Sequence, residues 1–294
     1  MEISEKKEGS LYSVTFLDEN KEIGHIEAIS DGHEWSRITE LKVAPGYEGE
    51  QLEVKLIESI KKTLKVHHIF AVTEQKLFPV YEEAGFFRSK TSFTFTETVN
   101  GETLKDWEDA GLFLPEGFRF EEEFYPRKSF IDNGSIEKKK DVGEIRYSDT
   151  LDGADFNEIN RVLSKAFGGH ERNANKTREV FSTSEKVELA FDGSTLVGVA
   201  RAVTDNKSNA LILNVAVDSC YQGFHIGWNI VVKLAEQLPD YSVFLNTHPG
   251  AVGFYNRKGF RRNRTAFCYT EGNMPLEISK GFNLPEGYRF PDEY

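Results

Sequence analysis

The chain repeats itself at a constant spacing. Residues 18–93 align without a gap with residues 192–267, and every matched pair differs by 174. Identical pairs include Gly24/Gly198, Val43/Val217, Tyr47/Tyr221, Tyr81/Tyr255, Gly85/Gly259 and Phe93/Phe267. Chance does not readily produce that register, so the sequence predicts two copies of one structural unit. A second echo follows each copy, LPEGFRF from Leu114 and LPEGYRF from Leu284, for which a brace on each domain or between domains is the plainest interpretation.

The repeats divide the chain. Between them lies RKSFIDNGSIEKKKDVG, whose charge density and Asn-Gly turn signal are typical of a linker. We therefore expect a first domain over residues 1–126, a linker over residues 127–143 and a second domain over residues 144–294. A length of 294 residues suits two domains of ordinary size.

Each copy carries the same order of hydrophobic patterns. Three strand-like segments come first, then a turn and helix, a strand, a second helix closed by glycine, and a last strand ending near Phe93 or Phe267. This order predicts a mixed, mostly antiparallel sheet flanked by helices in each copy, an α+β or mixed α/β class. The second copy alone has an amphipathic helix pattern at residues 154–167, so the first copy is expected to lack the opening strand and helices.

Composition indicates which classes of partner and which cellular compartment to expect. A net charge of −12 argues against nucleic acid and anionic membranes, which attract basic surfaces. Small molecules or proteins are the better expectation. Cys220 and Cys268 are too few for a disulfide framework or a cysteine-built metal site, so we expect no metal and a reducing cytoplasm. No run approaches the roughly 20 apolar residues of a membrane helix.

Residues 213–228, LNVAVDSCYQGFHIGW, read as strand, turn and helix. Such a turn aims successive backbone N–H groups and a helix N-terminus at one point, where an anion such as a pyrophosphate can bind. The same pattern also occurs as an ordinary packing turn.

Two motifs in the second copy resemble those of the GNAT superfamily of N-acetyltransferases. Residues 217–227 resemble the family's pyrophosphate loop, Q/R-x-x-G-x-G/A, with His225 at the central glycine and Ser219 at the lead-in proline. Residues 251–260, AVGFYNRKGF, are similar to the A-x-x-F-Y-x-x-x-G-F signature. The resemblance implies tandem GNAT-like domains and direct acetyl transfer from acetyl-CoA to a primary amine of a small molecule or peptide. The alternative is a non-catalytic acyl-CoA-binding regulatory protein.

The same resemblance assigns residues to roles. Tyr255 would be the general acid for the leaving thiolate; the alternative is that it only packs in the core with its hydroxyl on a backbone group. The strand at residues 215–217 would splay and turn a backbone N–H toward the thioester carbonyl. The expected cofactor-binding residues are Val215, Ala216, Val217, Gln222, Gly223, Phe224, His225, Ile226, Gly227 and Trp228. The expected acceptor-binding residues are Phe167, His170, Glu171 and Asn246.

Two features of the second copy stay open. Residues 209–217 hold no carboxylate, so the amine must lose its proton to ordered water, His170 or Glu171. A basic cluster near Tyr255 suits either the phosphates of coenzyme A or a solvated face; its members are Arg257, Lys258, Arg261, Arg262 and Arg264.

The first copy serves as an internal comparison. Where the second copy has Gln222, Phe224 and Gly227, the first has Glu48, Glu50 and Glu53. Each added carboxylate repels a polyanion by several kcal/mol at a dielectric typical of a protein surface, roughly 4 at 4 Å. The first copy is therefore expected to be a degenerate, non-catalytic unit that packs on the second, giving a monomer with an internal pseudo-dimer, or a homodimer.

Overall fold

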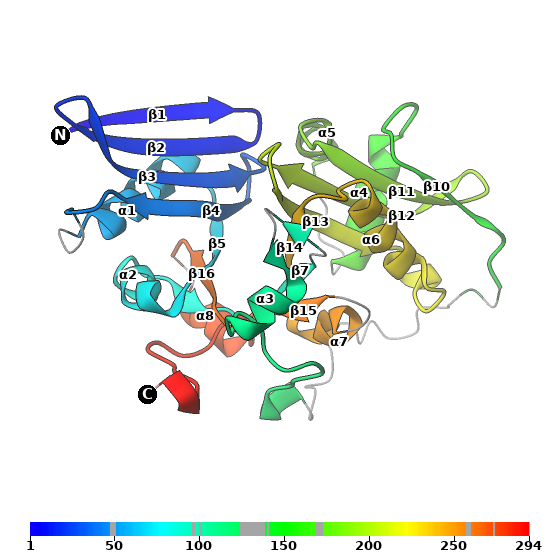
Figure 1. Ribbon diagram of the computed structural model, residues 1–294. Coiled ribbons are helices and arrows are strands. Elements are labelled where there is room, and N and C mark those ends of the chain that lie inside the picture. The colour runs from blue at the N-terminus through cyan, green and yellow to red at the C-terminus, as the bar shows by residue number, and fades with distance from the viewer. Residues whose placement is uncertain are drawn as a thin grey trace.

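Two seven-stranded mixed sheets form the protein, as seen in a computed structural model (Figure 1). It describes residues 1–47, 51–95, 98–99, 102–123, 139, 141–167, 173–256, 260–272 and 274–293. The first-repeat elements are β1 (Glu2–Glu8), β2 (Leu11–Asp18), β3 (Lys21–Ser30), β4 (Trp35–Val43), α1 (Leu52–Leu64), β5 (His68–Val72), α2 (Phe78–Glu83), β6 (Phe87–Arg88) and β7 (Ser92–Phe95). A short pair, β8 (Thr98–Val99) and β9 (Glu102–Thr103), and α3 (Leu104–Asp109) follow.

The second repeat has the same order with two additional helices between its first and second strands. Its elements are β10 (Ile145–Ser148), α4 (Phe156–Ala166), α5 (Ala174–Ser182), β11 (Lys186–Asp192), β12 (Thr195–Thr204), β13 (Asn209–Val217), α6 (Ile226–Glu236), β14 (Ser242–Asn246), α7 (Val252–Tyr255), β15 (Arg261–Arg262), β16 (Ala266–Thr270) and α8 (Met274–Ser279). In each sheet one neighbouring pair is parallel, β4 with β5 and β13 with β14. The expected fold class is therefore confirmed.

The repeats exchange their last strands. The first sheet runs β1-β2-β3-β4-β5-β16-β6 and the second β10-β11-β12-β13-β14-β7-β15. Figure 1 shows β16 (orange) beside β5, and β7 beside β14. Phe267 on β16 is opposite Ala71, and Phe93 on β7 is opposite Leu245. The repeated strand and helix order had predicted a complete sheet within each copy, so each repeat was expected to keep its own last strand. A local pattern specifies a strand but not its partner, so the exchange was not visible there.

Aromatic packing fixes the exchanged strands. Phe93 lies with its ring centre 5.7 Å from that of Tyr255, and Phe267 lies 5.6 Å from Tyr81. Both phenylalanines are completely buried. Burying a Phe side chain contributes roughly 1.5–3 kcal/mol, so each repeat supplies part of the other's core.

The two LPEG tails close the exchange. The Leu114 N–H donates to the Arg262 carbonyl at 2.9 Å, and the Leu284 N–H donates to the Arg88 carbonyl at 2.8 Å. Each tail thus attaches to the other repeat's arginine. The tails also meet in one apolar cluster formed by Leu114, Phe118, Phe120, Leu284, Tyr288 and Phe290. The two tails therefore connect one repeat to the other.

The first repeat does have an opening strand, so the expectation that it lacks one was wrong. β1 pairs with β2 along its whole length, from Glu2↔Leu17 to Glu8↔Leu11, as β10 pairs with β11 in the second repeat. Its sequence, EISEKKE, is almost entirely exposed. An edge strand with charged residues on both faces carries no hydrophobic alternation, so the pattern gave no signal.

The helices cover the sheets unequally. α6 packs on one face of the second sheet, while α4 and α5 cover the other through a cluster that includes Phe156, Leu163 and Phe181. α1 takes the place of α6 on the first sheet. Nothing equivalent to α4 and α5 occurs in the described part of the first repeat. The opposite face of that sheet carries polar side chains at His25, Glu27 and Glu40, and only its part next to the second repeat is apolar, where Ile29 packs against Val203 and Leu211.

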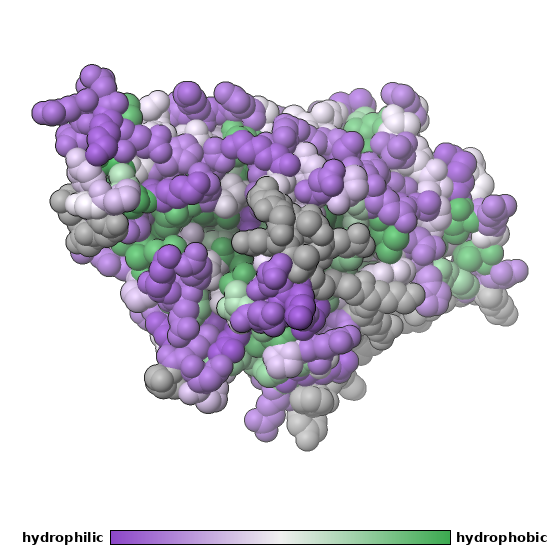
Figure 2. All heavy atoms as spheres, in the orientation of Figure 1, coloured by the Kyte–Doolittle hydropathy of each residue, from purple (hydrophilic) through white to green (hydrophobic). Residues whose placement is uncertain are grey.

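The outer surface agrees with the acidic composition. On the face shown in Figure 2, hydrophilic residues predominate and hydrophobic ones reach the surface in small separate areas. Within the described residues, no helix combines the length and the apolarity that a membrane crossing requires.

Candidate functional site

β13 and β14 separate before they end. They pair in parallel only from Asn209↔Ser242 to Leu211↔Phe244. Farther along β13, its register with β12 shifts, and Asn214 adopts a left-handed backbone with φ 54°. A bulge of this kind bends a strand and re-aims its backbone groups. The segment 215–217 therefore lies beyond the last residue pair that joins β13 to β14, at the opening between the two strands. That this segment turns a backbone N–H toward a thioester stays a prediction.

A tight loop carries the chain from β13 to α6. Gly223 has φ 101°, a conformation that favours glycine, and His225 has φ 61° as the residue preceding the helix. The exposed His225 side chain does not cap the helix. The Gln222 side chain donates to the Val217 carbonyl at 3.3 Å, which ties the loop to the strand. Since the first N–H groups of a helix lack partners within it, the start of α6 offers donors to an anion.

Asp218 holds this loop against α4. Its side chain accepts from the Cys220 N–H at 3.1 Å and from the Lys165 ammonium at 3.1 Å, and it pairs with the Arg161 guanidinium. Burial works against its charge, but these partners hold the pKa of Asp218 below its usual value. The carboxylate is therefore a charged anchor for the turn.

Gly227 lets α6 approach the strand closely. A Cβ there would lie 3.3 Å from Val217 Cγ2 and 3.6 Å from the Phe254 ring. Trp228 and Phe254 lie edge to face with ring centres 6.0 Å apart. In the first repeat the same position holds Glu53, in the first turn of α1. Glu48 and Glu50 lie outside the described residues.

Tyr255 lies on α7 within an aromatic group. It is 5 % exposed, and its ring centre lies 4.8 Å from that of Phe254 and 5.8 Å from that of Phe260. Burial raises the pKa of Tyr255, so the phenol stays protonated at neutral pH, as an acid must before it donates. Tyr81 is equally buried and its pKa is raised in the same direction. Burial alone therefore does not distinguish the proposed acid Tyr255 from its counterpart Tyr81.

A pocket of about 270 Å³ lies on the α4–α5 side of the second sheet. Its lining includes Asn214 at the bulge, so it reaches the strand that leads to residues 215–217. The lining residues are Asp31, His33, Glu34, Leu163, Asn173, Lys176, Thr177, Val180, Phe181, Arg201 and Asn214. Three of them come from the first repeat, Asp31, His33 and Glu34, although the sequence led us to expect a non-catalytic unit there.

The expected acceptor residues are only partly brought together. Phe167 ends α4 with 44 % of its surface exposed and does not line this pocket. Asn246 lies at the end of β14, beyond the last residue paired with β13, and its buried amide nitrogen has no hydrogen-bond partner among the described residues. A buried unpartnered donor is unusual and suits a ligand carbonyl. His170 and Glu171 lie outside the described residues.

Asp31, His33 and Glu34 were missed because they are far away in sequence. The one available signal in the sequence was the pair Asp31/Asp205, which is identical at the constant spacing of the repeats. No periodicity indicates that a turn in one repeat reaches a pocket in the other.

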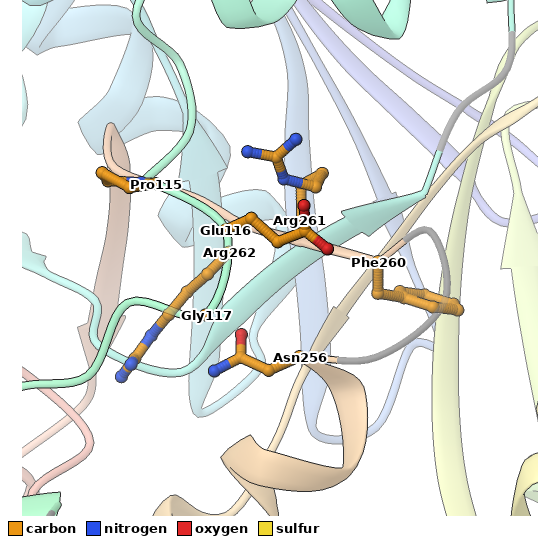
Figure 3. A pocket seen from close by; sticks show the side chains of 7 residues that line it. All are labelled: Pro115, Glu116, Gly117, Asn256, Phe260, Arg261 and Arg262. Atoms are coloured by element: carbon orange, nitrogen blue, oxygen red, sulfur yellow. The ribbon is translucent and has the colours of Figure 1, made fainter.

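The basic cluster near Tyr255 serves the protein's own structure. Arg261 pairs with Glu108, Arg262 with Glu123 and Arg264 with Asp292. Arg257 and Lys258 lie outside the described residues. The cavity beside this cluster measures about 20 Å³ and has room for about one water molecule (Figure 3). These pairs leave the three described arginines committed to internal contacts.

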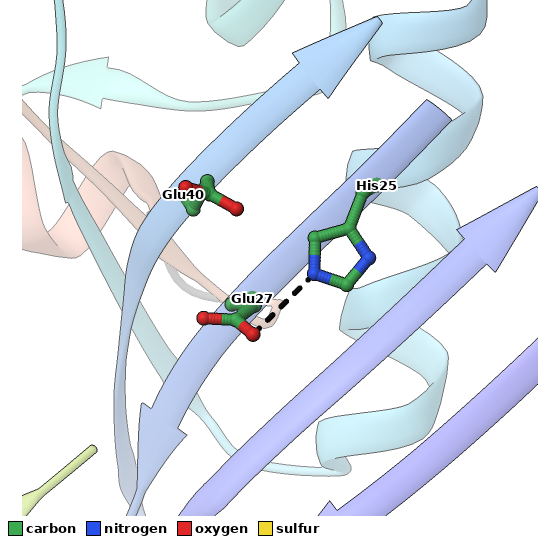
Figure 4. A group of neighbouring side chains, drawn as sticks. All are labelled: His25, Glu27 and Glu40. Carbon is green, nitrogen blue, oxygen red and sulfur yellow. Dashed lines mark ion pairs between the residues drawn. The ribbon is translucent and has the colours of Figure 1, made fainter. Parts of the chain in front are cut away.

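A histidine and two glutamates gather on the polar face of the first sheet (Figure 4). His25 Nε2 lies 3.4 Å from Glu27 on β3, and Glu40 is directly opposite Glu27 on β4. Lys207 neutralises Glu27 at 2.9 Å and Lys42 neutralises Glu40 at 2.5 Å. The glutamates thus already have cationic partners.

The fold and site define a two-repeat α+β protein with a splayed strand pair and a helix N-terminus at its opening. Residues 153–272 match the family model described as acetyltransferase (GNAT) domain. The match covers 120 of the 294 residues, all of them in the second repeat.

Curated relatives match parts of the chain. It is 37% identical over 70 residues to "Uncharacterized N-acetyltransferase ycf52" of Pyropia yezoensis, covering 23% of this chain and 40% of that protein. It is 31% identical over 123 residues to "Serotonin N-acetyltransferase 2, chloroplastic" of Oryza sativa subsp. japonica, covering 40% of this chain and 60% of that protein. The match spans less than two thirds of either relative.

Solved structures resemble most of the chain. A tandem GNAT protein from the clavulanic acid biosynthesis pathway is 14% identical with a TM-score of 0.43, covering 89% of this chain and 83% of that one. A GCN5-related N-acetyltransferase from Kribbella flavida is 12% identical with a TM-score of 0.47, covering 94% of this chain and 92% of that one.

Proposed function

We propose that this chain is an acetyl-CoA-dependent N-acetyltransferase that acts by direct transfer on a primary amine of a small molecule or peptide. The observation that carries the proposal is the start of α6 at the opening between β13 and β14, inside the segment that matches the GNAT domain. The names of the curated relatives agree with it.

The donors at this opening fit acetyl-CoA. Backbone N–H groups of residues 222–228 can bind the pyrophosphate, and the Asn246 amide can bind a carbonyl of the pantetheine arm. Gly227 leaves space where a side chain would meet Val217. Bound there, acetyl-CoA supplies an acetyl group activated as a thioester.

The chain's residues then divide the remaining work. Backbone N–H groups of residues 215–217 stabilise the negative charge on the carbonyl oxygen while the amine nitrogen forms its bond to the carbonyl carbon. The carbon–sulfur bond breaks, and the Tyr255 phenol gives its proton to the leaving sulfur. The amine's surplus proton leaves through water or a basic residue in the pocket, and solvent restores the phenol.

The pocket favours an amine with a compact apolar body. Leu163, Val180 and Phe181 supply apolar walls, and about 270 Å³ is less than the usual volume of a drug-sized site, about 300–1,000 Å³. One relative's name includes serotonin, an amine on an aromatic body. Arylalkylamines are therefore the first acceptors to test.

The first repeat acts as a structural partner without its own cofactor. Glu53 brings a carboxylate into the first turn of α1, where the corresponding position of α6 is Gly227. A negative side chain there opposes an anion at the helix start. With the strands exchanged, one chain already contains the paired arrangement that two subunits would otherwise form.

Release of coenzyme A from acetyl-CoA, measured with a panel of amines, tests the proposal. Amine-dependent release with matching acetylated product supports an enzyme. His225, in the place of a family glycine, motivates the alternative of a non-catalytic acyl-CoA-binding protein. Saturable acetyl-CoA binding without product from any amine would favour that alternative.

A further inference from the structure

We propose that the acceptor site is shared by both repeats, and that Glu34 of the first repeat binds the ammonium group of the incoming amine. This inference rests on the proposed function. It gives the first repeat a direct part in substrate selection, although that repeat lacks a cofactor site of its own.

The pocket has one wall from each repeat. α4 and α5 contribute the apolar side chains, and β12 and β13 contribute Arg201 and Asn214. The turn between β3 and β4 closes the remaining side with Asp31, His33 and Glu34. Without the first repeat the pocket would be open on that side.

Hydrogen bonds hold this turn rigidly relative to the bulge. Asp31 Oδ1 accepts from the N–H groups of His33, Glu34 and Trp35, each at 2.9 Å. Its other oxygen accepts from Arg201 Nη2 at 2.6 Å, and Arg201 Nε donates to the Asn214 side chain at 2.6 Å. Glu34 is therefore placed through a continuous chain of bonds that ends on the strand beside the expected thioester.

Glu34 is the acidic group of the pocket that can change partners. Asp31 is 5 % exposed and already accepts four hydrogen bonds at its two oxygens. Glu34 instead pairs with Lys176 at 3.5 Å, and the two side chains are 42% and 54% exposed, respectively. Exposed ion pairs of this kind contribute little, so a substrate ammonium can replace the lysine.

The charge and the walls together define the ligand class. A cationic amine gains a carboxylate from Glu34 while its apolar body contacts Leu163, Val180 and Phe181. The proposed ligand is therefore a primary amine carried on a small apolar or aromatic group. In the second repeat the position equivalent to Glu34 is Ser208, so no second acidic wall arises from the duplication.

The test compares Glu34→Gln with Glu40→Gln, which removes a glutamate from the polar face of the first sheet, outside this pocket. The probes are 2-phenylethylamine and the uncharged 2-phenylethanol, each titrated calorimetrically into the intact protein. We expect Glu34→Gln to weaken amine binding roughly tenfold, as expected for loss of a charge-assisted hydrogen bond. The alcohol should bind both variants and the wild type alike. Lys176→Met should tighten amine binding, because it frees Glu34.

Two results would overturn the shared site: equal amine affinity in Glu34→Gln and the wild type, or no binding of the amine by the wild type. Steady-state rates separate this failure from failure of the proposed function. If acetyl transfer occurs and its KM for the amine is unchanged in Glu34→Gln, the enzyme assignment stands and the Glu34 role falls. If the amine binds through Glu34 but no acetyl transfer occurs, the Glu34 role stands and the enzyme assignment falls.

Discussion

Arg201 Nη2 lies 2.6 Å from Asp31 Oδ2, and both side chains are 1% exposed. This buried ion pair joins a central strand of the second repeat to a turn of the first. Because Arg201 also contacts the Asn214 bulge, the same pair connects the repeat interface to the candidate site. The two repeats are thus joined by charge as well as by exchanged strands.

Asp31→Ala should destabilise the protein by about 3–5 kcal/mol, because it leaves the Arg201 charge buried without a partner. Denaturant unfolding with fluorescence detection measures the change. Asp152→Ala, at an exposed turn, is the matched control and should change stability little. Equal stability of the two variants would show that the Asp31–Arg201 pair does not stabilise the fold.

The same pair predicts a pH dependence. Burial opposes ionisation, but Arg201 and three backbone N–H groups hold the pKa of Asp31 below its ordinary value. A lowered pKa in the folded state means that the contribution to stability is present above the unfolded value of about 4 and is lost as pH falls below it. The difference in unfolding free energy between wild type and Asp31→Asn should therefore shrink in that acid range. A difference in unfolding free energy that stays constant from pH 6 to the most acidic measurable pH would contradict this role. The measurement should include about two pH values below 4, because the contribution of Asp31 is lost only there.

Strand exchange predicts that the halves stay together after the connection is cut. A protease site placed within residues 128–138, outside the described part of the chain, would separate the halves covalently. Since β7 belongs to the second sheet and β16 to the first, both fragments should elute together from a size-exclusion column without denaturant. Separate elution of two folded fragments would show that each repeat keeps its own last strand.

Much of this fold follows from the sequence, because the repeat and the strand and helix periods are local patterns. The loop at residues 222–227 and the Tyr255 helix were also placed by local motifs. Features that depend on distant pairing could not be predicted in this way. β7 carries the same strand pattern whichever sheet it joins, β1 lacks an apolar face, and Glu34 reaches the pocket only through the packing of the repeats.

Tyr255→Phe tests the general acid, and Tyr81→Phe is its matched control because both phenols are buried beside an exchanged phenylalanine. Loss of one general acid reduces the rate typically by 10²–10⁴-fold. We expect that reduction in kcat for Tyr255→Phe, with acetyl-CoA affinity retained, and little change for Tyr81→Phe. Similar rates in both variants would assign Tyr255 to packing alone.

Gly198→Ala should weaken the seating of α6 on its sheet. The added Cβ would lie 2.5 Å from Ile230 Cδ1 and 3.3 Å from the Ala216 carbonyl, so the Ile230 side chain must move and the Ala216 backbone must give way slightly. Overpacking of this kind costs typically 1–3 kcal/mol. Gly143→Ala, where the Cβ would meet only Asp192 Oδ1 at 3.5 Å, is the control. We expect a lower melting temperature for Gly198→Ala alone, and equal melting temperatures would show that the contact relaxes without cost.

The most direct test of the account is a calorimetric titration of the intact chain with acetyl-CoA. The splayed strands and the start of α6 predict one saturable site per chain, because the corresponding helix start in the first repeat carries Glu53. Binding of one acetyl-CoA that is abolished by Gly227→Glu and unaffected by Glu53→Gln is the predicted result. Two sites per chain, or none, would contradict the central claim that only the second repeat of this duplicated protein holds the cofactor.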